Sequence, residues 1–181
     1  MDDARQLYEK FLAGDPAQLA LLVERLGNPL LLFINSYVHD LATAEDLMED
    51  CFVQLLVSRP QFHGQSQFKT FLFQIGKNKA LNYLRRKQHF IWVNTDTAEA
   101  ELGEDAGILQ ELELNERNQA LYRAMRVLPA DYRRAVLLIY FEELSYEECA
   151  KVMGKTRKQI DNYLYRAKKQ LATLLGEEAP L

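Results

Sequence analysis

The residues of this 181-residue chain best suited to chemistry are basic and amide side chains near its C-terminal end. Arginine and asparagine can form paired hydrogen bonds with base edges in the DNA major groove, whereas lysine and arginine further along a helix suit phosphates. The residue types and their spacing therefore predict a surface that binds duplex DNA. The candidate contacts are Lys155, Arg157, Lys158, Asn162, Arg166, Lys168 and Lys169.

The chain shows no sequence pattern typical of an active site or a metal site. We find no phosphate-binding glycine loop, and no arrangement of serine, histidine and acid that suggests a nucleophile. Cys51 and Cys149 are isolated, and neither lies at metal-ligand spacing from a histidine. We interpret both cysteines as core residues, and we expect a non-enzymatic protein with no catalytic residue, metal site, disulfide or cofactor.

Two helix-start signals place the basic residues on the second helix of a predicted helix-turn-helix. Ser145 with Glu148, and Thr156 with Gln159, fit the capping box, in which both side chains bond free amides of a first helical turn. Gly154 lies where the first helix must end, since glycine adopts a left-handed backbone at little steric cost. A helix should therefore begin one residue after each cap, and such a pair can place its second helix in a major groove.

Apolar spacing on that second helix predicts which of its faces is buried. One stripe recurs at spacings of four, three and four and should face the neighbouring helices: Ile160, Leu164, Ala167 and Leu171. The basic residues fall mostly off this stripe. An alternative for the two lysines near the helix end is that they only complement the helix dipole and keep the surface solvated.

Composition indicates a globular, all-α protein. Apolar residues make up 48% of the chain, and there are no sustained runs of alternating polarity. We find no apolar run near the length of a membrane span, and the acidic start MDDARQLYEK is unlike a secretory leader. We therefore expect a cytoplasmic protein without a membrane span.

The net charge of −4 conceals two strongly basic segments. Residues 77–89 carry +5 without any acid, and residues 155–171 carry another +5, so the remainder of the chain carries −14. Affinity for phosphate depends on the local field and on counterion release, so two such patches can bind DNA on an acidic protein. The acidic remainder should disfavour indiscriminate binding.

An acidic segment separates the two basic ones. Residues 95–116 hold eight acids and no lysine or arginine, which is typical of a solvated tether. An alternative is that this acidic strand mimics nucleic acid and occupies a basic channel on a partner. The predicted division is a first domain of residues 1–92, a linker of 93–113, a second domain of 114–176 and a tail of 177–181.

The first domain is predicted to contain four helices. Asp15 caps the first, with Pro16 at its first position, and the run Gly-Asn-Pro at 27–29 interrupts the pattern before a second helix at 30–38. The fourth helix should run from about 68 to 87, with a first half that is apolar on several sides and a basic end. We expect this fourth helix to lie at the centre of the domain.

The third helix is predicted from Thr43 to about Ser58, with Thr43 and Asp46 as its capping pair. Its apolar face should be buried and consists of Leu47, Met48, Cys51, Phe52, Leu55 and Leu56. Beyond the linker, apolar spacing predicts helices over 114–128 and 132–141. With the helix-turn-helix, they make a four-helix second domain.

Three stretches resemble bacterial RNA polymerase sigma factors of the extracytoplasmic-function type. They are ATAEDLMEDCFVQLL, FHGQSQFKTFLFQIGKNKALNYLRRK and LPADYRRAVLLIYFEELSYEECAKVMGKTRKQIDNYLYRAKKQL, and the match covers nearly the whole chain. The resemblance rests on the order and spacing of these stretches together with the acidic linker. It implies an initiation factor that binds core RNA polymerase, directs it to a two-part promoter and helps to open the duplex.

In that family the first domain recognises and melts the promoter element nearest the start site, and a loop pocket holds an unstacked base. An opened strand offers the edges of its nucleobases to amide and hydroxyl groups and their faces to aromatic rings. Its phosphates are available to lysine and arginine side chains. The residues implied are in a loop and the following helix: Phe62, His63, Gln65, Ser66, Lys79, Asn82, Arg85 and Arg86. Four aromatic residues at helical spacing are better explained as core: Phe68, Phe71, Phe73 and Tyr83.

The resemblance also implies partners. The predicted third helix corresponds to the part of the family that grips the clamp of the polymerase's largest subunit, and the second domain docks on the flap of the other large subunit. The clamp contacts implied are Glu45, Asp46, Glu49, Asp50 and Gln54, although acids in a first turn also complement the helix dipole. We further expect promoter DNA as ligand, an anti-sigma protein as inhibitor, and a monomer when the protein is free.

Two other functions remain open at this point. A stand-alone dimeric helix-turn-helix repressor or activator would explain the C-terminal half, but it gives the basic helix at 68–87 no role. A recombinase or transposase would need a nucleophile among arginines, or a carboxylate cluster that binds metal. Tyr163 and Tyr165 lie beside basic residues. However, the sequence near them shows no arrangement of side chains that could serve as a general acid or general base. The sequence favours the initiation factor.

Overall fold

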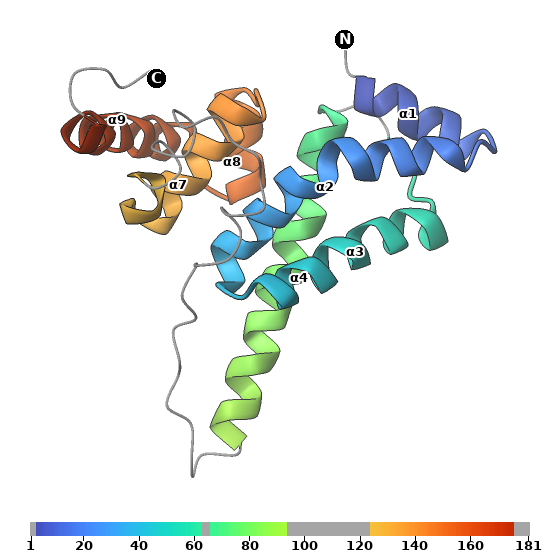
Figure 1. Ribbon diagram of the computed structural model, residues 1–181, viewed down its shortest axis with the longest axis horizontal. Helices are drawn as coiled ribbons and strands as arrows, with labels where there is room; N and C mark the ends of the chain where they lie inside the picture. Colours follow the sequence, from blue (N-terminus) through green and yellow to red (C-terminus); the bar gives the residue numbers. More distant parts are fainter. Residues whose placement is uncertain (1–2, 63–65, 94–123, 176–181) are drawn as a thin grey trace. The chain divides into compact units, whose positions relative to one another are not determined.

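The computed structural model describes residues 3–62, 66–93 and 124–175, with the backbone alone at 90–93 and 175. The chain divides into two compact units, Met1–Glu104 and Asp105–Leu181. Throughout the described ranges the regular elements are helices, and no strand occurs there (Figure 1). The predicted all-α fold is confirmed. The linker and the tail predicted from the sequence lie outside the described residues, apart from the helical residue 93.

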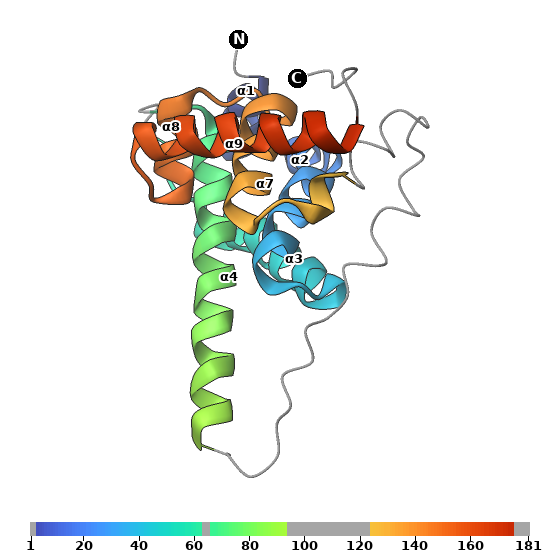
Figure 2. The same ribbon diagram turned by 90° about the vertical axis from the view of Figure 1, so that its left-hand side faces the viewer.

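The described part of the first unit consists of α1 (Asp3–Leu12), α2 (Ala17–Val38), α3 (Leu41–Ser58) and α4 (Phe68–Val93). α2 contacts α1, α3 and α4, and α4 also contacts α1 and α3. In both Figure 1 and Figure 2 the C-terminal half of α4 projects past the other three helices. The core of this unit therefore forms around α2 and the first half of α4.

α2 is a single helix where the sequence predicted two. Pro29 lies inside it, and the helix continues because Leu26 and Leu30 on either side are buried in the core. A proline in a helix interior costs about 3 kcal/mol, and full burial of two leucines offsets that cost at about 1.5–3 kcal/mol each. By length and composition α2 is also long and apolar enough to cross a membrane, so the prediction that no run approaches that length is wrong. Its buried residues make it the central core helix of this unit.

α1 was not predicted from the sequence. Ala4, Tyr8 and Phe11 are buried at spacings of four and three, which is the pattern of an amphipathic helix. The Tyr8 hydroxyl donates a hydrogen bond of 2.7 Å to the carbonyl of Pro60. The helix thus covers the end of the core and ties down the segment that leads to α4.

Gly76 allows α4 to approach α2 closely. A Cβ atom at this position would lie 2.8 Å from Leu30 Cδ1 and 3.3 Å from two carbons of Ile34. Leu30 and Ile34 are fully buried, so the absence of a side chain at Gly76 is what lets the two helices pack at this distance.

α3 begins two residues before its predicted start and has a narrower buried face. Asp40, not Thr43, is its N-cap, and the Asp40 carboxylate accepts hydrogen bonds from the Thr43 amide at 3.3 Å and from the Thr43 hydroxyl. Leu56 is 46% exposed, which contradicts its predicted burial. The core around α3 is filled by Ala44, Cys51, Phe52 and Leu55, and Leu56 points away from it.

α4 starts at the predicted residue and continues past the predicted end at residue 87. Phe68 and Phe73 are fully buried, which confirms that they are core residues. Phe71 and Tyr83 are half-buried. Cys51 and Cys149 are buried free thiols, and the Cys51 thiol donates to the carbonyl of Leu47 at 3.1 Å.

The described part of the second unit consists of α7 (Ala130–Val136), η1 (Leu137–Phe141), α8 (Tyr146–Met153) and α9 (Arg157–Leu175), preceded by a helical segment at 124–127. η1 is a stretch of π-helix that continues α7, so the helix predicted at 132–141 has two geometries. α9 contacts α7 and α8 (Figure 2). Residues 114–123 of the predicted helix 114–128 lie outside the described residues.

Candidate nucleic-acid interface

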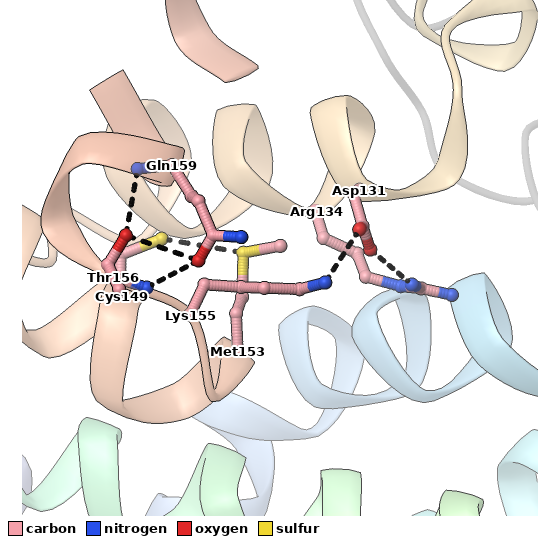
Figure 3. A network of polar contacts seen from close by, with 7 residues as sticks. All are labelled: Asp131, Arg134, Cys149, Met153, Lys155, Thr156 and Gln159. Carbon is pink, nitrogen blue, oxygen red and sulfur yellow. Dashed lines mark hydrogen bonds and ion pairs between the residues drawn. The ribbon is translucent and has the colours of Figure 1, made fainter. Parts of the chain in front are cut away.

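The helix-turn-helix forms as its capping residues predict. The Glu148 amide donates to the Ser145 hydroxyl at 3.2 Å, and the Ser145 amide donates to the Glu148 carboxylate at 3.0 Å. At the start of α9 the same pair of bonds joins Thr156 and Gln159, at 3.2 and 2.8 Å (Figure 3). Gly154 ends α8 with φ at 66°. These local bonds fix both helix starts and so set the position of α9.

The predicted buried stripe of α9 is confirmed. At most 2% of each side chain is exposed at Ile160, Leu164, Ala167 and Leu171. The opposite face of the helix carries an outer stripe of exposed residues with the same spacing of four, three and four: Lys158, Asn162, Tyr165 and Lys169. Two lysines, an amide and an aromatic ring in one row can contact phosphates, a base edge and a base or sugar face.

Tyr165 in this outer stripe was not among the candidate DNA contacts predicted from the sequence. Its side chain is 70% exposed, although a tyrosine on a helix of a small domain commonly packs against the core. From the sequence, Tyr165 was considered only as a possible nucleophile. The signal that was available is its spacing, because Tyr165 falls three residues after Asn162 and four before Lys169.

The remaining basic candidates contact groups of their own unit. Lys155 Nζ lies 3.2 Å from an Asp131 carboxylate oxygen on α7, and Arg157 Nη1 lies 2.9 Å from a Glu147 oxygen on α8. Arg166 Nη1 donates to the Tyr132 hydroxyl at 3.2 Å. The Asp131 partner raises the pKa of Lys155, so this lysine stays charged.

Lys168 lies apart from the outer stripe. Its Nζ lies 5.1 Å from the centre of the Tyr140 ring, which belongs to η1, and a hydrogen bond with the Tyr140 side chain raises the pKa of Lys168. A cation over an aromatic face contributes about 0.5–1 kcal/mol at an exposed site. The lysine therefore joins α9 to η1 as well as adding positive charge to the surface.

In the first unit, the structure places three of the eight predicted proximal contacts on the C-terminal half of α4. Asn82, Arg85 and Arg86 are exposed, and Arg85 Nη2 donates to Asn82 Oδ1 at 2.5 Å. Lys79 is nearer the core, with its Nζ 4.0 Å from an Asp50 oxygen on α3. Ser66 is half-buried and lies two residues before the start of α4. His63 and Gln65 lie outside the described residues.

Phe62 is packed against its own unit. Its ring centre lies 5.6 Å from that of Phe68 and 5.7 Å from that of Phe71, and the Arg5 guanidinium lies 5.9 Å from it. Phe62 is nevertheless half-exposed. Its contacts place it at the edge of the core, where one ring face can stay open to a ligand.

The acidic residues predicted for polymerase binding share the exposed face of α3. Glu45, Asp46, Glu49 and Asp50 are exposed, and Gln54 is half-buried. Sequence reasoning missed that the same helix continues with exposed apolar side chains: Val53 at 52%, Leu56 at 46% and Val57 at 74%. The signal was the apolar run at residues 55–57, which is too wide for a single buried stripe.

Within the described residues, no group of three or more histidine, cysteine or acidic side chains is placed to hold a metal ion. Burial raises the pKa of both Cys51 and Cys149 to about 12. Thiols with such pKa values are poor nucleophiles near neutral pH. The geometry of the described residues thus offers charged and polar binding surfaces.

Comparison with known proteins decides the family. A model of sigma-70 region 2 matches residues 22–90, and a model of sigma-70 region 4 matches residues 118–171. The RNA polymerase sigma-H factor of Pseudomonas aeruginosa is 32% identical over 96% of this chain and 96% of its own length. The ECF RNA polymerase sigma-E factor of Escherichia coli K12 is 30% identical over 91% of this chain and 90% of its own. The chain belongs to the extracytoplasmic-function sigma factors.

As a member of this family, the sigma factor directs promoter-specific initiation of transcription, and the family consists of initiation factors, not catalytic enzymes. The resemblance inferred from the sequence is confirmed. The stand-alone repressor is not favoured, because it would not account for the region 2 match at 22–90.

Solved structures show the same fold. The sigma factor RpoE, in its co-crystal structure with the anti-sigma factor NepR from Bartonella quintana, is 25% identical to this sigma factor, with a TM-score of 0.61 over 86% of this chain and 97% of that one. CnrH, in complex with the cytosolic domain of CnrY, has a TM-score of 0.60 at 21% identity, over 97% of this chain and 98% of that one. The second likeness concerns the fold alone.

Proposed function

We propose that this sigma factor binds core RNA polymerase through the exposed face of α3, and that it contacts the promoter at two places, through α4 and through α9. The observation that carries the proposal is the separation of charge on exposed faces. Acids occupy the exposed face of the first half of α3, whereas lysines and an asparagine line the outer stripe of α9. Proteins and nucleic acids that meet such surfaces must carry the opposite charge.

On α3, the acids are followed along the helix by Val53, Leu56 and Val57. A polar and apolar surface of this kind suits a protein partner, because apolar burial supplies affinity and the acids select a basic partner surface. We assign this face to the clamp of the largest polymerase subunit, and we assign the second unit to the flap of the other large subunit.

On α9, the outer stripe is assigned to the distal promoter element. Asn162 suits an adenine edge, Lys158 and Lys169 suit phosphates, and Tyr165 suits a base methyl group or a sugar. Arg157 and Arg166 lie beside the stripe, and each already contacts a side chain of its own unit. They can reach DNA only if they give up these contacts for contacts with DNA. The domain comprising residues 114–176 therefore supplies distal recognition.

On α4, Asn82, Arg85 and Arg86 are assigned to the proximal promoter element. They are exposed on the part of the helix that projects past α2 and α3 (Figure 1). A strand that has left the duplex exposes base edges to Asn82 and phosphates to the two arginines. The domain comprising residues 1–92 thus supplies both polymerase binding and promoter opening.

The solved relatives suggest a further partner. RpoE of Bartonella quintana was crystallised with an anti-sigma factor, and the related fold supports an anti-sigma protein for this chain as well. Such an inhibitor would cover the α3 face and the outer stripe of α9. We place the sigma factor in the cytoplasm as a monomer that awaits polymerase.

Reconstitution with core RNA polymerase tests the proposal. The purified chain and core enzyme are incubated with fragments of genomic DNA, and transcription start sites are mapped. Start sites should share two upstream sequence elements at a constant separation, and core enzyme alone should give none of them. Start sites without shared elements, or failure of the chain to bind core enzyme, would refute it.

A further inference from the structure

Asp131 holds two cations in the second unit (Figure 3). It lies in the first turn of α7, where its Oδ1 accepts a hydrogen bond from Arg134 Nη1 at 3.0 Å. Its Oδ2 lies 3.2 Å from Nζ of Lys155, in the turn that precedes α9. Each carboxylate oxygen therefore has its own cation, and the two pairs fix the orientation of the carboxylate.

This arrangement is more protected than the other ion pair of the helix-turn-helix. The side chains of Asp131 and Lys155 are 34% and 32% exposed, and that of Arg134 is 11% exposed. Arg157 and Glu147, by comparison, are 67% and 59% exposed. Water and salt screen an exposed pair strongly and a half-buried pair much less. The Asp131 pair should thus persist under conditions in which Arg157 is released.

The position of Lys155 also separates it from the outer stripe of α9. Its Nζ lies 5.9 Å from the centre of the Tyr163 ring, and that ring lies 5.4 Å from the ring of Tyr132 on α7. Lys155 is thus at the junction of α7 and α9. Lys158, in contrast, is exposed on the outer stripe, and no partner of its side chain occurs among the described residues.

We propose that Asp131 limits the affinity of the distal promoter site for DNA, because it holds Lys155 on α7 and so keeps one positive charge from the DNA phosphates. The inference rests on the proposed role of α9 in promoter contact. Phosphate neutralisation strengthens binding to every sequence alike, whereas base contacts favour the promoter. Holding Lys155 back therefore lowers the affinity for all DNA by about the same factor, so that stable binding depends more on base contacts and on polymerase.

Removal of the Asp131 charge should reverse this effect. Asp131→Asn has nearly the same shape, but it leaves the mostly buried Arg134 beside Lys155 without the shared carboxylate. Like charges repel, and the long lysine side chain can move to solvent more easily than Arg134 can. Lys155 then becomes available to a phosphate on any sequence.

The test compares the salt dependence of DNA binding by holoenzymes that carry four versions of the chain besides the wild type: Asp131→Asn, Lys155→Gln, the double variant and Lys158→Gln. Each is assembled with core polymerase. Binding is measured between 50 and 200 mM KCl on a promoter fragment recovered with the wild-type holoenzyme and on a shuffled duplex of equal length and composition. The slope of log K against log salt reports the number of phosphates neutralised.

The expected result separates the two lysines. Asp131→Asn should steepen the slope by about 0.9 on both duplexes, which corresponds to an additional loss of about 3.5-fold between the two salt concentrations. It should also strengthen binding to both duplexes by about the same factor. Lys155→Gln alone should leave the slope unchanged, and the double variant should return to the wild-type slope. Lys158→Gln, the matched control, should reduce the slope by about 0.9.

Two results would overturn the inference. A slope that falls with Lys155→Gln would mean that Lys155 already contacts a phosphate, and an unchanged slope with Asp131→Asn would mean that the carboxylate has only a structural role. If Asp131→Asn does not fold, the Lys155→Gln measurement decides alone. Failure of the proposed function gives a different pattern, because the wild type would not prefer the promoter fragment or Lys158→Gln would leave the slope unchanged.

Discussion

Gly154 ends α8 with a left-handed backbone, at φ 66° and ψ 40°. Its amide donates to the carbonyl of Lys151 at 3.3 Å, and the next amide, of Lys155, donates to Ala150 at 3.0 Å. A residue with a Cβ atom pays about 1–2 kcal/mol in this conformation. The glycine therefore determines both the end of α8 and the direction in which the chain enters α9.

Replacing Gly154 with alanine should lower the free energy of unfolding of the second unit by about 1–2 kcal/mol. Gly154→Asn is the matched variant, since asparagine tolerates the left-handed region better, and it should be less destabilising. Urea unfolding followed by circular dichroism, with a transition fitted for each unit, measures both. Equal stability of the alanine and asparagine variants would count against the backbone explanation.

Cys51 and Cys149 should resist alkylation in the native protein. Burial raises the pKa of each thiol to about 12 from a usual 9. The neutral thiols thus contribute stability that is fully present below pH 9 and is lost as the pH rises toward 12. At pH 8, iodoacetamide should label them only as fast as their units open, and urea should accelerate the reaction. A cysteine introduced at exposed Ser58 is the control, and native thiols that react as fast as this one would contradict the assignment.

At the scale of elements, two glycines inside helices differ in how much space surrounds them. Gly76 lies where α4 packs closely on α2, and Gly27 of α2 has more room. A Cβ at Gly27 would meet its nearest atoms at 3.8 and 3.9 Å, which is ordinary contact, whereas one at Gly76 would lie 2.8 Å from Leu30. Alanine in a helix interior gains about 1 kcal/mol over glycine. Overpacking at Gly76 costs about 1–3 kcal/mol, which cancels or exceeds that gain.

We therefore predict different outcomes for two identical substitutions. Gly27→Ala should raise the stability of the first unit by about 0.5–1 kcal/mol, and Gly76→Ala should be less stable than Gly27→Ala by about 1–3 kcal/mol. Urea unfolding of both variants beside the wild type measures the difference. If both alanines stabilised the unit equally, the close packing of α2 on α4 at Gly76 would be incorrect.

α3 offers a charge test of the polymerase surface. Glu49→Lys should weaken binding to core polymerase at least about tenfold, or about 1.4 kcal/mol, because the basic partner surface would meet a like charge. The loss should be the same on all promoters. Glu24→Lys, an equal charge reversal at an exposed position of α2, is the control and should bind as the wild type does. Competition with labelled wild-type protein for core enzyme measures both, and equal losses for the two variants would exclude a local site on α3.

The elements that sequence predicted well are those fixed by neighbouring residues. The starts of α8 and α9 depend on Ser145 with Glu148 and on Thr156 with Gln159, and each pair lies within one helical turn. The buried stripe of α9 likewise follows from spacing on a single helix. Local chemistry of this kind can be recognised in the sequence because no other segment has to be placed first.

The features that sequence missed depend on segments that are distant along the chain. Pro29 signalled a break, but burial of Leu26 and Leu30 by the neighbouring helices outweighs its cost. Lys155 pairs with Asp131, which lies 24 positions away in the sequence. From the sequence alone, Lys155 therefore could not be distinguished from the unpaired lysines of α9. Leu56 was assigned to the core from its apolar spacing alone. The assignment failed because the width of the buried face depends on how α2 and α4 pack on α3. Tertiary contacts decide each of these cases.

For the molecule as a whole, the distribution of charge matters more than the net value of −4. Part of the basic charge is already paired within the second unit, at Lys155 and Arg157. The outer stripe of α9 contributes only Lys158 and Lys169 as unpaired cations among its described residues. Two phosphate contacts give modest affinity at physiological salt, so under the proposed function stable promoter binding needs the additional contacts of polymerase and of α4.

This limited affinity leads to a prediction about assembly. A helix-turn-helix repressor gains affinity by presenting two copies of its recognition helix, and it must dimerise to do so. This sigma factor carries matches to both region 2 and region 4 in one chain, so a single copy can supply both promoter contacts. Sedimentation equilibrium of the free protein should therefore give the monomer mass of 21.0 kDa at every concentration tested.

The same experiment with core polymerase should give one sigma chain per enzyme, and promoter binding should appear only in that complex. Addition of a promoter duplex without polymerase should leave the free monomer almost unbound at physiological salt, because few phosphates are neutralised. A stable dimer that binds the promoter alone would instead mean that two α9 helices act together. In that case the outer stripe would read two half-sites about one helical turn apart, and α4 would have no part in recognition.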